Sequence, residues 1–438
     1  MPAETFSLDR YLERARGAEP LPALGRVVRT VGLLVESRGP HARVGELCEL
    51  MSSHGEPPLP LEVVGFRDGL LQSVPLGSTS GIRPGDRIVA RGGTASIRVG
   101  EGLLGRVIDG LGRPLDGGGP LVSSGTYPLQ PPPLNPLARD PIVSPLGTGV
   151  RAIDAMLTCG RGQRIGVFGG SGVGKSTLLG MMARGTAADI SVIALVGERG
   201  REVRGFLEHD LGEQGLRRSV VVVSTSDNPA LVRLRAAYAA TSIAEYFRDQ
   251  GRNVLLMMDS VTRFAMAQRE VGLAAGEPPT AKGYPPSVFA LLPGLLERAG
   301  NVRGRGSITG FYTVLVEGDD HSEPVADHVR AILDGHIVLS RGLAARNHYP
   351  AIDILHSVSR TMPDVTDVDH RMQASRVREW MATNHASEDL VAVGAYVPGS
   401  NPRIDEALAR REPIAAFLRQ DAHDLKPLGD AIAALKAL

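Results

Sequence analysis

Short apolar runs separated by turn residues dominate the first part of the chain. From about residue 24 to residue 98, Gly, Pro and Asp turns divide the β-type runs RVVRTVGLLVE, LEVVGF, LLQSVPL and DRIVARG. Closing such strands on themselves removes exposed strand edges. We therefore predict an N-terminal β-barrel over residues 19–98.

The pattern changes in the middle of the chain, where near-continuous apolar runs alternate with helical stretches. The runs are RIGVF, SVIALV, SVVVVS, NVLLMM and ITGFYTVLV. Strands of this kind are typical of a parallel sheet covered on both faces. One connecting helix is well marked, because the Asp-Asn-Pro sequence at 227–229 supplies a cap and a first-turn proline and Gly251 follows its end. We predict an α/β domain over residues 99–362.

Helical patterns without strong strands occupy the two ends. Residues 363–438 predict a small helical domain. Residues 7–16 predict a short amphipathic helix, which either packs on its own domain or binds a partner. We assign residues 1–18 to a partner-binding helix. Its apolar side carries Leu8, Tyr11, Leu12 and Ala15.

The composition excludes several classes of protein. Basic and acidic residues balance at 48 each, which speaks against a general nucleic-acid binder. Cys48 and Cys159 are isolated, so neither a zinc site nor a disulfide framework is indicated, and a reducing cytosol fits best. The sequence has no apolar stretch of bilayer length, and its start lacks the apolar core of a signal peptide. We expect a cytoplasmic protein.

The strongest chemical signal is GGSGVGKST at residues 169–177, in the spacing GxxxxGK[ST] between the strand RIGVF and a helix. Glycines let successive backbone N–H groups surround phosphates, and the helix N-terminus adds partial positive charge. Lys175 would reach the β- and γ-phosphates, and Ser176 would bind Mg²⁺. The nucleotide-binding residues predicted here are Gly169, Gly170, Ser171, Gly172, Val173, Gly174, Lys175, Ser176 and Thr177.

Two carboxylates follow buried strands of the same predicted sheet. Asp259 ends the run VLLMM, where it can hold the Mg²⁺ shell, although an aspartate in this position is often only a strand-end or cap residue. Glu198 follows SVIALV and can polarise the attacking water; its alternative role is an ion pair with Arg199 or Arg201. The sequence predicts an ATPase with Mg²⁺ as cofactor.

Several longer strings resemble one family. VGERGREV, LLMMDSVTRFAMAQREVGLAAGEPPTAKGYPPSVF, GSITGFYTVLVEGDD and DGHIVLSR are similar to sequences of the type III export ATPases, relatives of the catalytic subunits of rotary ATP synthases. Within that group the chain most resembles the flagellum-specific members. The resemblance implies a RecA-like P-loop core and a homohexameric ring whose ATP hydrolysis energises protein export. The injectisome ATPases are the close alternative.

The resemblance also assigns roles to single residues. Glu198 corresponds to the catalytic carboxylate, and Arg263 to an arginine near the phosphates. Arg360 corresponds to the finger that reaches the γ-phosphate of the neighbouring subunit. Tyr349 corresponds to the aromatic that stacks on adenine, and Tyr396 is expected to close that pocket. Without the family, Arg360 would be an ordinary surface arginine and Tyr349 a packed aromatic.

The implied partners follow from the same resemblance. The loop at 277–287, with Lys282 nearby, corresponds to a segment facing the central channel and is expected to contact a central stalk protein. Residues 1–18 correspond to the region that binds a stator-like regulator. The other expected partners are the export gate, chaperones and exported proteins, with the ATPase peripherally associated with an inner-membrane export apparatus.

Two further alternatives share the ring ATPase core. A Rho-like RNA translocase is disfavoured by the neutral charge and by an aromatic content of only 4%, so we expect no nucleic-acid partner. A non-catalytic nucleotide-binding subunit of a rotary ring is disfavoured because Glu198 is present. ATP synthesis is less expected than hydrolysis, since the sequence offers no membrane segment for a proton path.

Overall fold

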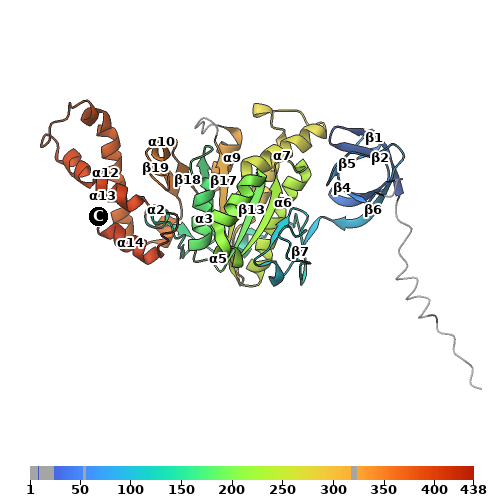
Figure 1. Ribbon diagram of the computed structural model, residues 1–438, viewed down its shortest axis with the longest axis horizontal. Helices are drawn as coiled ribbons and strands as arrows, with labels where there is room; N and C mark the ends of the chain where they lie inside the picture. The colour runs from blue at the N-terminus through green and yellow to red at the C-terminus, as the bar shows by residue number, and fades with distance from the viewer. Residues whose placement is uncertain (1–7, 9–23, 53–55, 317–322) are drawn as a thin grey trace, which may run out of the picture. The chain divides into compact units, whose positions relative to one another are not determined.

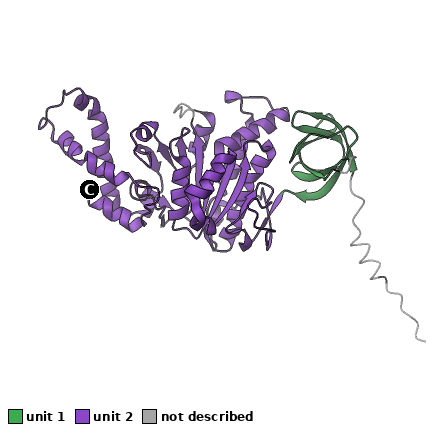
Figure 2. Cartoon of the chain, in the orientation of Figure 1, with its two compact units in different colours: residues 1–95 green, residues 96–438 purple. Residues whose placement is uncertain are grey.

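A computed structural model describes residue 8 and residues 24–52, 56–316 and 323–438 (Figure 1). The chain forms two compact units, residues 1–95 and 96–438 (Figure 2). The amphipathic helix predicted within residues 1–18 lies outside the described residues, apart from Leu8. It stays a prediction.

The first unit contains a closed six-stranded barrel, which confirms the predicted N-terminal fold. Its apolar core includes Val35, Cys48, Leu61 and Ile88, each with less than 1% of its surface exposed. Burial raises the pKa of the Cys48 thiol to about 11, so this cysteine is a packed core residue. In barrel order the strands are β1 (Leu24–Val31), β2 (Leu34–Arg38), β5 (Leu70–Pro75), β4 (Leu59–Arg67), β3 (Glu46–Met51) and β6 (Arg87–Thr94).

The second unit is built around one large sheet. Neighbouring strands are parallel except for two pairs, β18–β19 at one edge and the short β16 beside β17, so the predicted parallel core is confirmed. The strand order is β19 (Ile352–Ser359), β18 (Gly335–Leu339), β12 (Arg164–Gly169), β17 (Ser307–Leu315), β15 (Asn253–Asp259), β13 (Ile190–Glu198), β14 (Ser219–Thr225) and β8 (Val107–Asp109), with β16 (Gly300–Asn301) beside β17.

Helices cover both faces of this sheet. In β13 every residue before Glu198 is buried, although successive side chains point to opposite faces. Helix α6 (Ala230–Asp249) contacts β13, β14 and β15. Ile193 and Leu195 of β13 share a core cluster with α3 (Lys175–Gly185). Helices α7 (Val261–Ala274) and α9 (Pro324–Ile332) also pack on the sheet, and α8 (Pro286–Leu296) packs on these two helices.

The predicted start of α6 was wrong in detail. The helix begins at Ala230, and Pro229 itself is the N-cap. The amide of Asn228 donates to Thr225 Oγ1 at 2.8 Å, at the end of β14. The side chain expected to cap the helix therefore closes the preceding turn instead.

Helices make up the C-terminal part of the second unit, as predicted. They are α11 (Met362–Val365), α12 (Val368–Ala392), α13 (Pro402–Leu418) and α14 (Leu428–Lys436), and they contact α2 (Arg151–Met156) and β19. The strands β7 (Ser96–Val99) and β9 (Gly125–Pro128) pair within the second unit. The domain boundaries predicted at 98 and 362 stay predictions.

Short elements connect these parts. They are η1 (Glu101–Leu103), η2 (Pro136–Ala138), β10 (Pro145–Leu146), β11 (Cys159–Gly160), α4 (Gly200–Gly205), the π-helix η3 (Phe206–Leu211), α5 (Gly212–Arg217), η4 (Ala281–Gly283) and α10 (Arg341–Ala345). Within the described residues, no helix has both the length and the apolar character that crossing a membrane requires.

Candidate nucleotide site

The phosphate loop lies where the sequence predicts it, between the carboxyl end of β12 and the first turn of α3. Gly172 and Gly174 have φ values of 79° and 90°, which residues with a side chain rarely adopt. The Lys175 ammonium donates to the carbonyl oxygens of Gly169, at 3.0 Å, and of Gly170. The loop is therefore folded around its lysine, and the N-terminus of α3 supplies the partial positive charge that favours phosphate.

The two predicted carboxylates meet at the same edge of the sheet. Asp259 ends β15 and Glu198 ends the neighbouring strand β13. Asp259 is only 6% exposed, and the hydroxyl of Thr313 donates to its Oδ1 at 2.5 Å. Thr313 lies on β17, the strand between β12 and β15. Strand order thus brings the lysine and both carboxylates to one rim.

The negative charges of Glu198 and Asp259 are not fully neutralised by protein groups at this rim. Burial, and then the negative charge of Asp259, raises the pKa of Glu198 to about 8. Burial also raises the pKa of Asp259, against the opposing effects of Thr313 and Lys175. A cation close to both carboxylates would stabilise their ionised forms.

Magnesium fits this set of donors. The described residues include no cluster of three or more His, Cys, Asp or Glu side chains suited to hold a metal ion. Mg²⁺ needs no such cage, because it usually keeps several waters and binds one or two protein groups together with substrate phosphates. The hydroxyl of Ser176, exposed in the first turn of α3, and the carboxylate of Asp259 are suitable groups.

Arg263 joins the same rim from the first turn of α7. A Cβ atom added to Gly197, whose φ is 72°, would lie 2.9 Å from the Cβ of Arg263. Its positive charge lowers the pKa values of Glu198 and Asp259, in each case against the larger, raising effect of burial. The glycine before Glu198 thus lets this arginine approach both carboxylates closely.

Glu202 is a fourth charged neighbour that the sequence reasoning missed. It hydrogen-bonds to Glu198 and contributes to the raised pKa of that carboxyl, after burial and Asp259. It lies four residues after Glu198, in α4, and pairs with Arg199 at 3.5 Å. The second glutamate of the GERGRE string was the available signal.

Tyr349 also lies beside the phosphate loop. A Cβ atom added to Gly174 would be 3.6 Å from the Tyr349 ring. The tyrosine is 42% exposed, so part of it remains open to solvent. Its carbonyl accepts a hydrogen bond from the Gln420 N–H at 2.9 Å, which ties it to the C-terminal helices. This position suits the predicted contact with a base.

Arg341 is a loop contact that the sequence reasoning missed. It begins α10, directly after β18, the other neighbour of β12 in the sheet. A Cβ atom added to Gly170 would lie only 2.4 Å from its Nη2 atom. Asp259 was predicted because it is a charged residue that follows an apolar run. Arg341 follows the apolar run HIVLS in the same way, so the same signal was available for it.

We expect Arg341→Gln to raise the Mg-ATP concentration needed for half-maximal turnover by about 10- to 100-fold, since one charge-assisted contact beside the phosphates is worth roughly 1.5–3 kcal/mol. Arg346→Gln is the matched control, because Arg346 follows the same helix but pairs with Glu388. Steady-state ATPase kinetics measure both variants. Equal kinetics in the two would contradict the assignment.

Arg360 lies at the opposite end of the sheet from the phosphate loop. It follows β19, and its N–H donates to the carbonyl of Asp334 at 3.0 Å, immediately before β18 begins. This position is level with Arg164, the first residue of β12. At about 3.3 Å per residue, β12 separates Arg360 from its own phosphate loop by roughly 16 Å. Arg360 is exposed, and at this distance its side chain does not reach the phosphate loop of its own subunit.

Tyr396 is not brought to the site in this subunit. It lies in the connection between α12 and α13, where its hydroxyl donates to Asp405 at 2.9 Å. No contact recorded among the described residues joins it to Tyr349 or to the loop at 169–177. Its predicted role in closing the adenine pocket therefore stays a prediction.

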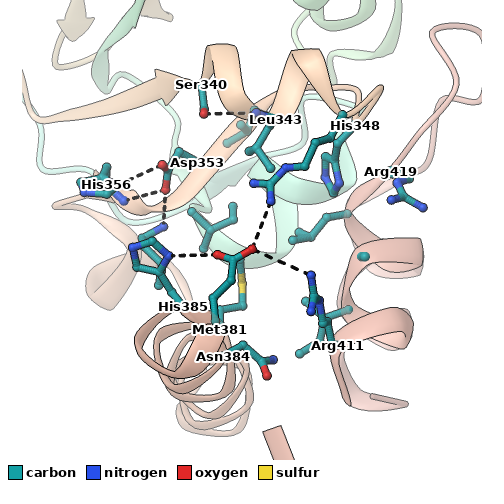
Figure 3. Close-up of a pocket in the computed structure, with 18 of the residues that line it drawn as sticks. Ser340, Leu343, His348, Asp353, His356, Met381, Asn384, His385, Arg411 and Arg419 are labelled. Carbon is teal, nitrogen blue, oxygen red and sulfur yellow. Dashed lines mark hydrogen bonds and ion pairs between the residues drawn. The ribbon is translucent and has the colours of Figure 1, made fainter. Parts of the chain in front are cut away.

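A separate cavity of about 380 Å³ lies between β19, α10, α12 and α13 (Figure 3). His348 lines it, whereas the next residue, Tyr349, lies against the phosphate loop. Glu388 pairs across it with Arg346 and Arg411, at 3.4 and 4.0 Å. The described residues that line this cavity include none from 169–177, so it is distinct from the nucleotide site.

Comparison with known families agrees with this geometry. The sequence profile of the ATP synthase α/β family nucleotide-binding domain matches residues 149–359, and that of the T3SS EscN ATPase C-terminal domain matches residues 366–437. A flagellum-specific ATP synthase of Bacillus subtilis is 54% identical over 94% of each chain. The chain belongs to the type III secretion ATPases of the ATP synthase α/β family. The predicted resemblance and the predicted ATPase activity are thereby confirmed.

Other members of this ATPase family are nearly as similar. A type 3 secretion system ATPase of Xanthomonas euvesicatoria is 50% identical, over 97% of this chain and 96% of its own. The assembled ATPase EscN of enteropathogenic E. coli superposes with a TM-score of 0.89 at 47% identity, covering 94% of this chain and 99% of EscN. EscN in complex with its central stalk EscO gives 0.87 at the same identity and coverage.

Proposed function

We propose that this ATPase hydrolyses Mg-ATP as a homohexameric ring and thereby energises protein export by a flagellar type III secretion apparatus. The observation that carries the proposal is the division of the catalytic parts between the two ends of β12. Lys175, Asp259 and Glu198 lie at the carboxyl edge of the sheet, where β12 ends, and the exposed Arg360 lies level with the start of β12. A complete site then needs two subunits.

In the proposed mechanism each side chain has one task. Lys175 would turn from the loop carbonyls towards the β- and γ-phosphates, and Ser176 and Asp259 would hold Mg²⁺, which supplies positive charge to the phosphates. Glu198 orients and polarises the attacking water. Arg263 balances the carboxylates and Tyr349 stacks on adenine, whereas Tyr396 has no support from this subunit alone.

The loop at 277–287 suits a contact with a central stalk. Tyr284 is buried beneath Arg269, whose guanidinium lies 5.1 Å from its ring centroid, and Glu277 accepts from the Ser287 N–H at 3.1 Å. Ala281 and Lys282 are exposed at the tip. EscN binds a central stalk protein, and we infer that this chain presents its tip to one as well.

Replacing Ala281 and Lys282 with glycine and serine is expected to reduce export severalfold while ATP hydrolysis by the purified ring stays within twofold of the unaltered enzyme. ATP hydrolysis should persist because the two replaced residues are exposed and the contacts of Tyr284 and Glu277 remain. Secreted substrate and phosphate release are measured in parallel. Unchanged export would dismiss the stalk contact.

The remaining partners are proposed on the family resemblance. Residues 1–18 bind a stator-like regulator, and removing them should abolish that binding while nucleotide binding persists; retained binding would refute the assignment. The ring works in the cytoplasm at the inner-membrane export apparatus, with the export gate, chaperones and exported proteins as partners. RNA stimulation of ATP hydrolysis would instead favour an RNA translocase.

An injectisome is the second candidate setting, because relatives from both systems reach at least 50% identity. We favour the flagellar system, since three relatives at 51% to 54% identity carry flagellar names. Deletion of the gene separates the two: loss of filaments is expected, whereas normal filaments with lost effector secretion would favour the injectisome.

A further inference from the structure

Gln163 occupies an unusual position directly before the strand that carries the phosphate loop. Its side chain is fully buried and makes hydrogen bonds at both ends. The amide Nε2 donates to the carbonyl of Asp334 at 3.1 Å and to the hydroxyl of Ser359 at 3.2 Å. The amide oxygen accepts from the Gly160 N–H at 2.8 Å. One buried amide therefore joins three separate segments of chain.

These contacts converge on the base of Arg360. The same Asp334 carbonyl that accepts from Gln163 also accepts from the Arg360 N–H, at 3.0 Å. Ser359, the second partner, directly precedes Arg360, and its hydroxyl also donates to the carbonyl of Thr158 at 2.9 Å. Gln163 thus holds the residue that precedes Arg360 and the carbonyl that accepts the Arg360 N–H.

The surrounding groups make this anchor rigid. Arg164 donates through Nε and Nη2 to the two carboxylate oxygens of Asp334, at 2.9 and 3.0 Å. The Arg360 guanidinium itself donates to the carbonyl of Leu333 at 3.2 Å. Gly335 is opposite Ser359 in the β18–β19 pair, and a Cβ atom added there would lie 3.2 Å from Gln163 Nε2.

We propose that Gln163 is a positioning residue for the arginine finger and acts on the active site of the neighbouring subunit. The inference rests on the proposed function, in which Arg360 works in trans. It has a further consequence for the ring. At its carboxyl end, strand β12 carries the phosphate loop of its own subunit, beginning at Gly169. At its amino end lies the anchor of Arg360, which acts on the neighbouring subunit. One short strand therefore connects two neighbouring active sites.

The expected effect is large but incomplete. Gln163→Met keeps the length and much of the volume of the side chain but loses both hydrogen-bonding ends. Arg360 itself is unchanged, but the backbone around it loses the hydrogen bonds that hold it in place. Because a misplacement of about 1 Å can cost roughly 100-fold in rate, we expect turnover to fall by about 10- to 100-fold with ATP affinity unchanged. Ser359→Ala, which removes one hydroxyl, should show a smaller loss of the same kind.

The test uses full-length subunits mixed before the ring assembles. Glu198→Gln subunits hydrolyse ATP only very slowly but carry an intact Gln163 and Arg360. With these in fourfold excess, single-turnover hydrolysis per Gln163→Met subunit should rise severalfold, because most defective fingers are then replaced by intact ones from a neighbour. Arg360→Ala subunits, mixed in the same way, provide the reference for a lost finger.

Each outcome decides the proposal. Rescue of both Gln163→Met and Arg360→Ala supports it. Rescue of Arg360→Ala alone shows that the finger acts in trans but that Gln163 serves its own subunit, which overturns the inference. Rescue of neither overturns the trans finger and this inference with it. Ser219→Ala is the matched control, because this buried serine begins β14 and bonds to Gly215, away from Arg360; it should turn over normally.

Discussion

Arg360→Ala is expected to slow ATP hydrolysis by about 10³- to 10⁵-fold, the range that a finger donated to a phosphoryl-transfer site supplies. ATP binding should change little, because the finger stabilises charge that develops on the transferring phosphoryl group and lies far from its own subunit's loop. Turnover and equilibrium binding of a fluorescent ATP analogue give the two values.

The matched control is Arg403→Ala, since Arg403 is a strongly exposed arginine on α13 that pairs only with surface Glu379 in the described structure. It should retain full activity. A finger variant that kept more than a tenth of normal turnover would show that the charge is supplied by some other group.

Glu198→Gln is expected to reduce turnover by at least about 10²- to 10⁴-fold, the usual contribution of a positioned acid–base group. The amide keeps the shape of the side chain but cannot accept a proton. ATP should bind at least as tightly as before, because the amide, unlike an ionised Glu198, adds no negative charge to a rim that already holds Asp259 and Glu202. Single-turnover hydrolysis and nucleotide binding separate the two effects.

Glu208→Gln provides the comparison, because Glu208 lies in η3 and pairs with Arg204 on the surface. That variant should behave as the unaltered enzyme does. If Glu198→Gln instead lost nucleotide binding and kept the rate at saturation, its carboxylate would have to be reassigned to the metal shell.

Linear motifs were sufficient to predict the centre of the site. The spacing of 169–177 and the strand-end positions of Asp259 and Glu198 follow from the chain alone, since parallel strands end at one edge. Thr313 could not be found in this way. It meets Asp259 only because β17 lies between β12 and β15, and no local pattern specifies the order of strands in a sheet.

Arg360 and Tyr349 required the family resemblance, because a single arginine or tyrosine after a short run has no distinguishing pattern. The structure gives a physical reason for their different roles: Tyr349 lies near the phosphate loop of its own subunit, whereas Arg360 lies a strand's length away from it. Strand β18 carries only five residues and was recognised only as a family string. Arg341, which follows it, was missed for that reason.

Both cysteines of the chain are buried, Cys48 in the barrel core and Cys159 with its thiol pKa raised well above the usual value by burial. Thiolates are the form that reacts with maleimides, so the native protein offers such reagents almost nothing to attack. A single cysteine introduced at the exposed Lys282 should therefore be labelled selectively in the otherwise natural sequence. Fluorophores or cross-linkers could then follow the loop tip in working rings.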